Sequence, residues 1–267
     1  MINIGIIGYG KMGRTRAQAI EQVGLGRIAA VWDSVAVDPG TYKFAHDEEE
    51  ILNSSEIDAI FICTPNYRIV PLTKAALAAG KHVFSEKPPA FTAKGLKAVL
   101  ALERSSGCKL MYGFNHRHHG SVMKMKTIID SGELGRVLWM RGRYGKEVDE
   151  SFFKGGFDEV HAFVSNLFWK IPGVEDNVFA ILRSSETGVC ASLHSTMTQW
   201  RYLFSLEVFL ERGALVLNGL KTSSGVYGDE NLAIKRNLEH PEEGKFEKEE
   251  HNVYHNDTSW NSEVKHF

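Results

Sequence analysis

The chain has 267 residues, of which 43% are hydrophobic and 24% are charged, a composition that is ordinary for a globular protein. Its formal net charge of -2 gives no electrostatic reason to expect nucleic acid or an anionic membrane as a partner. The three cysteines are dispersed without metal-ligand spacing, and the first residues lack the basic start of a signal peptide. No apolar run is long enough to cross a bilayer, so we expect a cytoplasmic protein.

Strands and helices alternate along the first half of the sequence. Short apolar, β-branched runs predict strands that are buried on both faces, at residues 2–7, 27–32, 58–63, 82–85 and 109–114. Apolar residues at helical spacing predict helices at residues 12–23, 70–79 and 93–105, and Asp47 is expected to cap a further, acidic helix. This βα order predicts a doubly wound parallel sheet of the Rossmann type.

The second half changes character near Asn115. One helix is expected at residues 121–131, and strand-like runs with short connections then recur. These runs cover residues 137–144, 159–165, 178–183, 189–196, 204–210 and 214–217. The charged residues 237–248 are expected to form a solvated loop or edge, and residues 259–267 a helix. The sequence therefore predicts an α/β Rossmann domain over residues 1–115 and an α+β domain with a largely antiparallel open sheet over residues 116–267.

A G-x-G-x-x-G motif lies between the first strand and the first helix. Its six residues are Gly8, Tyr9, Gly10, Lys11, Met12 and Gly13. In a dinucleotide-binding turn the first glycine permits the tight turn, the second admits the pyrophosphate and the third lets helix and strand pack closely. The following helix would offer its free N–H groups to the phosphates. The position and spacing of the motif predict a dinucleotide site formed by these six residues.

Asp33 ends the second strand, close to twenty positions after the motif. Its carboxylate can accept hydrogen bonds from ribose hydroxyls and would repel a 2′-phosphate. Ser34 follows it, where an arginine or lysine would favour NADP. We therefore predict NAD as the cofactor, with NADP less favoured.

Two further turns follow predicted parallel strands, at the edge where such sheets bind ligands. They are the turn Thr64, Pro65 and Asn66, and the turn Glu86, Lys87 and Pro88. Together with the glycine motif, these turns resemble the glucose–fructose oxidoreductase, inositol dehydrogenase and rhizopine-catabolism (Gfo/Idh/MocA) family. The resemblance extends over Gly113-Phe114-Asn115 with Arg117, over residues 131–135, and into the second domain at residues 174–177.

The resemblance implies an NAD(P)-dependent oxidoreductase that transfers a hydride between nicotinamide and a carbinol or carbonyl carbon of a sugar, cyclitol or nucleotide sugar. Lys87 would then hydrogen-bond the reacting oxygen and stabilise developing alkoxide charge. Glu86 and the turn from Thr64 to Asn66 would line the nicotinamide riboside, and Pro88 would fix its turn in a defined isomer, cis being one option. Open sheets of this family pair in homodimers or homotetramers, so the second-domain sheet is expected to do the same.

The histidine-rich segment after the fifth predicted strand is interpreted as a polar hinge and not as a metal site. Adjacent histidines on an irregular segment do not converge as a helical i, i+4 pair would. Three of its residues are candidates for substrate contact: Asn115, His116 and Arg117.

The sequence departs from the family pattern after Tyr144. The family has a helix there that carries an aspartate and the acid/base histidine, and no such helix is recognisable between Phe153 and Gly156. His161 lies in a strand-like run, an unfavourable place for this role. Three explanations compete: the native protein is longer than this sequence, the chain is a deletion product, or another residue such as His116 or Tyr144 is the acid/base. We favour the first, which an intact mass well above 29.9 kDa would support.

The competing functional hypothesis is a dinucleotide-binding protein without turnover, acting as a sensor or assembly component.

Overall fold

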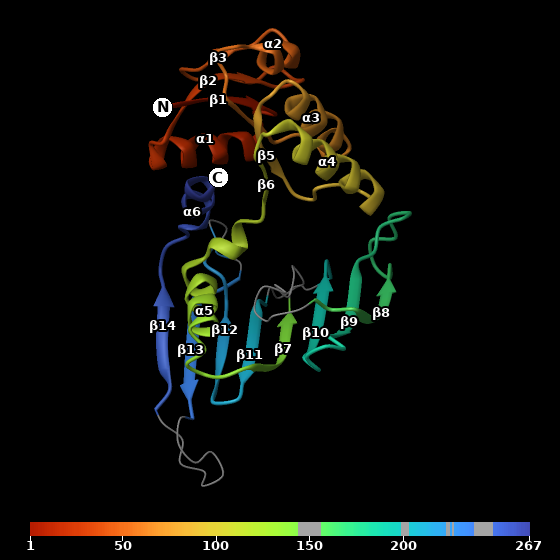
Figure 1. The fold of residues 1–267 in the computed structure, drawn as a ribbon, viewed down its shortest axis with the longest axis vertical. Coiled ribbons are helices and arrows are strands. Elements are labelled where there is room, and N and C mark those ends of the chain that lie inside the picture. Colours follow the sequence, from red (N-terminus) through yellow and green to blue (C-terminus); the bar gives the residue numbers. More distant parts are fainter. Residues whose placement is uncertain (144–155, 199–202, 223–224, 226, 238–247) are drawn as a thin grey trace. The chain divides into compact units, whose positions relative to one another are not determined.

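The computed structural model describes residues 1–143, 156–198, 203–222, 225, 227–237 and 248–267 (Figure 1). Their contacts divide the chain into two compact units. The first unit comprises Met1–His118 and Thr258–Phe267, and the second comprises His119–Asp257. The two units are therefore described separately.

The first unit is built on a six-stranded sheet in which every neighbouring pair is parallel. The strands are β1 (Ile2–Ile7), β2 (Gly26–Trp32), β3 (Lys43–Phe44), β4 (Ala59–Ile62), β5 (His82–Glu86) and β6 (Leu110–Gly113). Their order in the sheet is β3-β2-β1-β4-β5-β6, the Rossmann order, which turns back on itself between β1 and β4. The predicted parallel sheet is confirmed, and β3 is a strand that the sequence analysis missed.

Helices connect these strands and bury their apolar faces on the sheet. They are α1 (Lys11–Val23), α2 (Glu48–Asn53), α3 (Asn66–Ala78) and α4 (Ala93–Ser106), followed by the 3-10 helix η1 (Asn115–His118). Asp47 caps α2 as predicted, since its side chain accepts a hydrogen bond from the Glu50 N–H. The α3 helix begins four residues before the predicted start and contains Pro71, a residue that sequence rules disfavour inside a helix.

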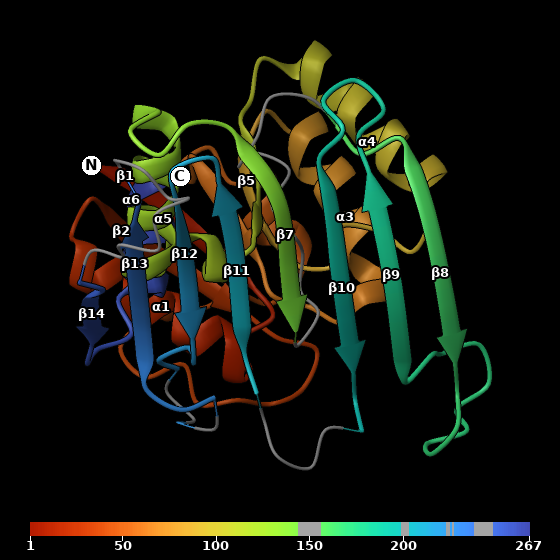
Figure 2. The same cartoon turned by 90° about the horizontal axis from the view of Figure 1, so that it is seen from below.

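The second unit contains an eight-stranded sheet that is antiparallel except for one pair (Figure 2). Its strands are β7 (Val137–Arg143), β8 (Glu159–Ser165), β9 (Asn177–Arg183), β10 (Cys190–Thr196), β11 (Ser205–Leu210), β12 (Gly213–Asn218), β13 (Glu230–Arg236) and β14 (Glu250–Tyr254). The order is β14-β13-β12-β11-β7-β10-β9-β8, with β7 and β10 parallel. The predicted open sheet is confirmed, but β13 and β14 were not predicted. The charged loop expected at residues 237–248 lies mostly outside the described residues.

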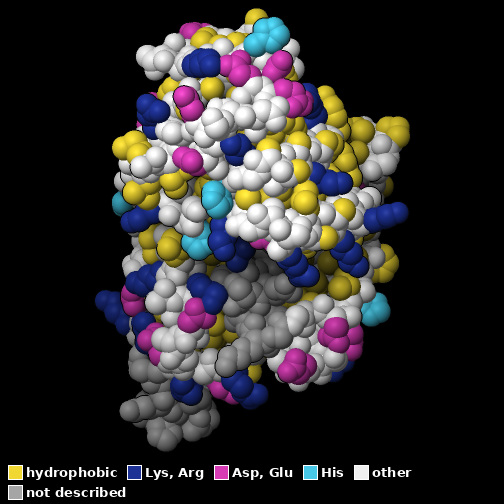
Figure 3. Space-filling model, turned by 45° about the horizontal axis from the view of Figure 1, so that its top comes forward, with side chains coloured by type: hydrophobic (Ala, Val, Ile, Leu, Met, Phe, Trp, Pro, Cys, Tyr) yellow, Lys and Arg dark blue, Asp and Glu magenta, His cyan; other side chains and the backbone are white. Residues whose placement is uncertain are grey.

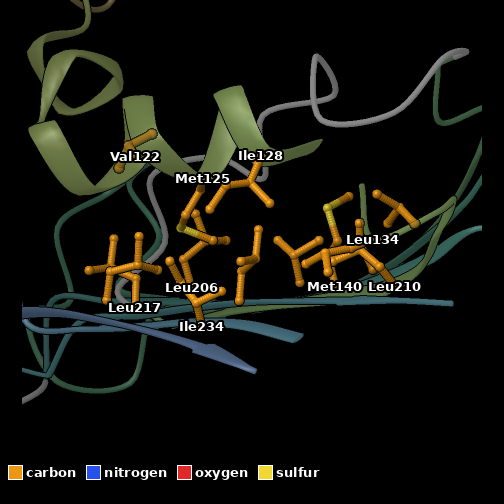
Figure 4. Packing of buried hydrophobic residues seen from close by; sticks show 14 of the residues in the cluster. Val122, Met125, Ile128, Leu134, Met140, Leu206, Leu210, Leu217 and Ile234 are labelled. Carbon is orange, nitrogen blue, oxygen red and sulfur yellow. The ribbon is translucent and has the colours of Figure 1, made fainter. Parts of the chain in front are cut away.

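One helix, α5 (Gly120–Ser131), packs against the β12–β14 half of this sheet. Figure 4 shows Val122, Met125 and Ile128 of α5 above apolar side chains of the sheet, among them Leu217 and Ile234. These side chains are at least nine-tenths buried and form the core of the second unit. At the opposite end of the sheet, β8 exposes large apolar side chains, and Phe163 is 84% exposed.

A buried carboxylate holds the start of α5. Glu230 of β13 accepts hydrogen bonds from the backbone N–H groups of Ser121 (3.2 Å) and Lys221 (2.9 Å), and it contacts Nδ1 of His119 at 2.8 Å. Burial alone would raise the pKa of Glu230, but the hydrogen bonds from His119, Ser121 and Lys221 hold it below its ordinary value. Glu230 therefore acts as a helix cap supplied from a distant strand.

Glu230→Gln is expected to destabilise the protein by about 1–3 kcal/mol at pH 7, because it leaves buried N–H groups with a poorer acceptor. A carboxylate with a lowered folded-state pKa stabilises the fold above its unfolded pKa of about 4.3, and this contribution is lost as the pH falls through the folded pKa. The stability gap between wild type and variant should therefore be full above about pH 5 and shrink below about pH 4. Urea unfolding from pH 7 to pH 3.5 measures it, and a constant gap would contradict the assignment.

The last ten residues were assigned to the second domain in the sequence analysis, whereas the contacts place Thr258–Phe267 in the first unit. They contain the helix α6 (Ser259–His266), which packs on α1 and η1. Phe267 meets the rings of Phe61 and Phe84 edge-on, with centroids 5.5 Å and 5.7 Å away. Aromatic packing of this kind buries a large apolar area, which explains why the segment returns to the first unit.

Among the described residues, no helix combines the length and apolarity that a membrane crossing requires. On the face shown in Figure 3, basic and acidic side chains are both spread over the surface.

Candidate functional site

Four strands of the first unit end at one edge of the sheet. In register, Ile7 of β1 pairs with Ile62 of β4, Ser85 of β5 also pairs with Ile62, and Glu86 pairs with Gly113 of β6. The residues that follow each strand are therefore brought together at the carboxyl edge, where open α/β sheets bind ligands. Three of the sequence motifs start there, after β1, β4 and β5.

Two glycines of the G-x-G-x-x-G motif are required by the chain itself. Gly8 has φ +94°, and a Cβ there would lie 2.6 Å from the backbone of Cys63. At Gly13 a Cβ would lie 2.2 Å from the Gly8 carbonyl oxygen. Gly8 thus allows the turn next to β4, and Gly13 allows α1 to approach the turn, which agrees with the roles inferred from the sequence.

Gly10 is different, because a Cβ there would meet no described atom within 4 Å. Its φ of -74° also suits any L-residue. It forms the N-cap of α1 without a side-chain hydrogen bond, and the first turn carries no acidic residue. Open space beside an uncapped helix start fits a diphosphate, which would accept hydrogen bonds from the exposed N–H groups.

The other motif residues differ in what they expose. Lys11 is exposed and Met12 is half-buried at the start of α1. The Tyr9 side chain is buried, packed edge-on against Tyr42 with Arg14 4.8 Å from its ring centroid. Only the backbone of Tyr9 can therefore face a dinucleotide.

Asp33 immediately follows β2 and is half-buried. Its Oδ1 accepts a hydrogen bond from the Val35 N–H at 3.2 Å, a turn that holds the carboxylate at the strand end. The Gly8 N–H donates to the Trp32 carbonyl at 2.8 Å, so the glycine turn and the end of β2 are joined directly. This placement is compatible with an aspartate that accepts hydrogen bonds from a ribose.

The turn after β4 leads into α3. Pro65 is the N-cap of this helix and Asn66 its first residue, and both are exposed. The Thr64 hydroxyl oxygen is buried and lacks a hydrogen-bond partner among the described residues. A buried hydroxyl without a partner is costly, and a ligand hydroxyl at this edge would satisfy it. Next to it, burial raises the pKa of the Cys63 thiol, so this residue stays a neutral thiol.

The turn after β5 separates two neighbouring charges. Lys87 is exposed, whereas Glu86 is buried and 6% exposed. The Lys87–Pro88 peptide bond is cis, one of the options expected from the sequence. The Glu86 carboxylate, which the resemblance placed beside the nicotinamide riboside, accepts a hydrogen bond from Nε of Arg16 at 2.7 Å. It is thus occupied by a partner from α1.

Arg16 is a residue of this edge that the sequence analysis missed. It is fully buried, and its guanidinium donates to Glu86 from β5 and to Glu263 from α6. The buried face of α1 repeats at helical spacing through Gly13, Arg16, Ala17 and Ile20. An arginine within that apolar stripe is the signal in the sequence, because a buried charge requires a partner elsewhere in the chain.

The histidine-rich segment forms η1 and has no strand geometry. Asn115 donates a hydrogen bond from Nδ2 to the Ser259 hydroxyl at 3.0 Å, while His116 is half-buried and Arg117 exposed. Burial lowers the pKa of His118 to about 4, helped by His266 and Arg117, so this imidazole is neutral at pH 7. The described residues contain no group of three acidic, histidine or cysteine side chains arranged for a metal.

The segment that departs from the family's acid/base helix lies largely outside the described residues. Residues 144–155, including Tyr144 and Phe153, lie outside the described residues. His161 lies on β8 with its side chain exposed. The identity of an acid/base residue therefore stays a prediction.

Comparison with known proteins identifies the first unit. Residues 2–114 match a family described as an oxidoreductase family with an NAD-binding Rossmann fold. The oxidoreductase YrbE of Bacillus subtilis is 36% identical over 138 residues, which are 49% of this chain and 40% of that protein. Inositol 2-dehydrogenase of Salmonella typhimurium is 30% identical over 156 residues, 54% of this chain and 46% of the enzyme. The matches thus span less than half the length of these curated relatives.

Solved structures extend the likeness in fold to both units. An NAD-binding oxidoreductase from Klebsiella pneumoniae is 18% identical with a TM-score of 0.77, covering 99% of this chain and 88% of that one. A levoglucosan dehydrogenase in complex with NADH and L-sorbose is 20% identical with a TM-score of 0.76, covering 98% and 82%. At these identities the likeness concerns the fold, a Rossmann unit followed by an open, mostly antiparallel sheet. Residues 2–114 therefore match the NAD-binding Rossmann part of the Gfo/Idh/MocA oxidoreductase family, and the solved structures share the fold of both units.

Proposed function

We propose that this protein is an NAD-dependent oxidoreductase that transfers a hydride between nicotinamide and a carbinol or carbonyl carbon of a sugar, cyclitol or nucleotide sugar. The observation that carries the proposal is the carboxyl edge of the first sheet. There the open space at Gly10, the unsatisfied hydroxyl of Thr64 and the exposed Lys87 follow β1, β4 and β5. The family match of residues 2–114 supports the same function, since inositol 2-dehydrogenases are among the similar proteins.

Bound NAD would supply the hydride acceptor, and the chain would supply position and charge. The backbone around Gly10 and the start of α1 would bind the diphosphate. Lys87 would donate a hydrogen bond to the reacting oxygen, and its ammonium would stabilise negative charge as that oxygen becomes an alkoxide. Thr64, Pro65 and Asn66 would line the riboside, whereas substrate contacts are assigned to Asn115, His116 and Arg117.

Asp33 is proposed to select NAD over NADP. Asp33→Ala is expected to weaken NAD binding about tenfold and to bring the affinities for NAD and NADP closer together, because the variant removes a ribose acceptor and a repulsive charge. Titration of nicotinamide fluorescence with NADH and NADPH measures both dissociation constants. Exposed Glu49 of α2 provides the control as Glu49→Ala, which should leave the ratio unchanged. An unchanged ratio in Asp33→Ala would count against this assignment.

A dinucleotide-binding protein without turnover is the second candidate. It is favoured by the sequence between Tyr144 and Val160, in which the D-x-x-x-H pattern of the family's acid/base helix does not occur. Formation of NADH at 340 nm with a panel of myo-inositol, levoglucosan, aldoses and nucleotide sugars separates the two candidates. Turnover of any of these supports the oxidoreductase, and tight NADH binding without turnover of any supports the second candidate.

The remaining proposals concern assembly and location. The sheet of the second unit exposes Phe163, Phe179 and Ile181 on β8 and β9, an apolar surface larger than scattered single residues would give. We assign this surface to a homodimer or homotetramer interface, which sedimentation velocity would test. The three cysteines are free, which is compatible with the reducing conditions of the cytoplasm.

A further inference from the structure

The first unit buries a charge cluster that includes the last residue of β5. Arg16 of α1 lies between two carboxylates, Glu86 at the end of β5 and Glu263 on α6. Arg16 and Glu263 are fully buried, and Glu86 is nearly so. Removing several charged groups from water is expensive, so a cluster of this kind is weak evidence for stability and calls for another explanation.

The cluster is tightly enclosed. The guanidinium carbon of Arg16 lies 4.4 Å from the ring centroid of Phe84 and 4.6 Å from that of Trp260, so two aromatic faces cover it. On β6, a Cβ at Gly113 would come within 2.6 Å of Nη2 of Arg16. The planar guanidinium therefore has little freedom to move, and the Glu86 carboxylate that it holds has little freedom either.

Glu86 is the last residue of β5, and Lys87 is the next residue in the chain. We propose that Arg16 and Glu263 are positioning residues for Lys87, which act by holding Glu86 through its carboxylate. With Glu86 directed inward to Arg16, the chain turns so that Lys87 is exposed at the carboxyl edge. The pairing also prevents the Glu86 carboxylate from neutralising the adjacent ammonium. The proposal rests on the function proposed above for Lys87.

The same cluster links this turn to α6. Glu263 belongs to a segment that the chain forms only after it has passed through the whole second unit. The start of this segment is tied to η1 by the hydrogen bond from Asn115 to Ser259. The chain leaves the first unit after His118 and returns to it at Thr258. Both of these points are thereby connected to the turn that carries Lys87. Burial raises the pKa of Glu263, which makes its negative charge easier to lose.

Three variants test the proposal in the full chain. Glu263→Gln keeps the shape and an acceptor for Arg16, Arg16→Lys keeps the charge without the planar fork, and Lys265→Gln removes an exposed charge from the same helix as a control. The surroundings of Lys87 are monitored through its NMR signal in reductively ¹³C-methylated protein, assigned with Lys87→Arg. Unmodified protein gives the NADH dissociation constant, the melting temperature, and kcat and KM for the best substrate of the panel.

Glu263→Gln and Arg16→Lys are expected to shift the ¹³C-methyl NMR signal of Lys87 and to lower kcat about tenfold or more, because small displacements of a reacting group are costly. NADH affinity should stay within about twofold, and Lys265→Gln should change nothing. A lower melting temperature with an unchanged Lys87 signal and unchanged kcat would overturn the proposal and leave a structural role. If wild type turns over no substrate, the proposed function fails, while the Lys87 signal still decides whether Arg16 and Glu263 position it.

Discussion

Replacing Lys87 with alanine is expected to lower kcat about a hundredfold or more and to change the dissociation constant of NADH less than about threefold. Lys87 is exposed at the end of β5, and its ammonium is assigned to the oxygen on which charge develops. Removing a single preorganised donor to such an oxygen typically costs about 10²–10³ in kcat. The dinucleotide is proposed to make its main contacts elsewhere, at the start of α1 and at the end of β2, so its affinity should be retained.

Steady-state kinetics and NADH fluorescence titration measure the two quantities on the same preparation. Lys94→Ala is the matched control, because Lys94 is an exposed lysine on the neighbouring helix α4. Lys87→Arg keeps a cation but changes its shape and should recover only part of kcat. Full activity in Lys87→Ala would remove this residue from the mechanism and leave the dinucleotide site intact as a hypothesis.

Gly10→Ala is expected to weaken NADH binding, whereas Gly13→Ala is expected to lower the stability of the fold. Gly10 has open space and a negative φ, so Gly10→Ala should leave the melting temperature unchanged and weaken NADH binding about tenfold or more, by placing a methyl group where the diphosphate approaches. At Gly13 a methyl group would lie 2.2 Å from a backbone oxygen. Gly13→Ala should therefore destabilise the first unit by about 1–3 kcal/mol, and binding should weaken as a consequence.

Thermal unfolding with and without NADH separates these effects. Wild-type protein should gain stability with ligand, and Gly10→Ala should gain much less from the same starting point. Gly24→Ala is not a suitable control because Gly24 has φ +69°, whereas exposed Ala101→Gly on α4 reports an ordinary glycine–alanine difference. If Gly10→Ala binds NADH as wild type does, the diphosphate does not lie against this helix start.

The sequence predicts the parts of the fold in which local pattern and buried contacts agree. Buried β-branched runs identify β1 and β4, and the glycine motif, Asp33 and the two turns after β4 and β5 occur where expected. The hydrophobic pattern of the sequence does not predict the strand at the β14 edge of the second sheet. There β14 (EHNVY) is mostly exposed, so hydrophobic alternation gives little indication of a strand.

The Arg16 cluster could not be predicted, because its members are distant in the sequence. Arg16 and Glu86 are separated by 70 positions, and Arg16 and Glu263 by 247. The motif around Glu86 suggested a role toward the cofactor, and nothing local indicates that its carboxylate is already paired. The sequence does contain the complementary signal, an arginine in an apolar helix stripe, but it does not identify the partner.

The return of the last segment to the first unit also has a consequence for biosynthesis. Thr258–Phe267 supplies Glu263 to Arg16 and Phe267 to the rings of Phe61 and Phe84. During translation, residues 1–118 leave the ribosome long before this segment exists, so the nascent Rossmann sheet must wait with Arg16 paired to Glu86 alone and with aromatic surface uncovered. A nascent chain stalled after His118 should therefore be more sensitive to proteases and more dependent on chaperones than the released protein.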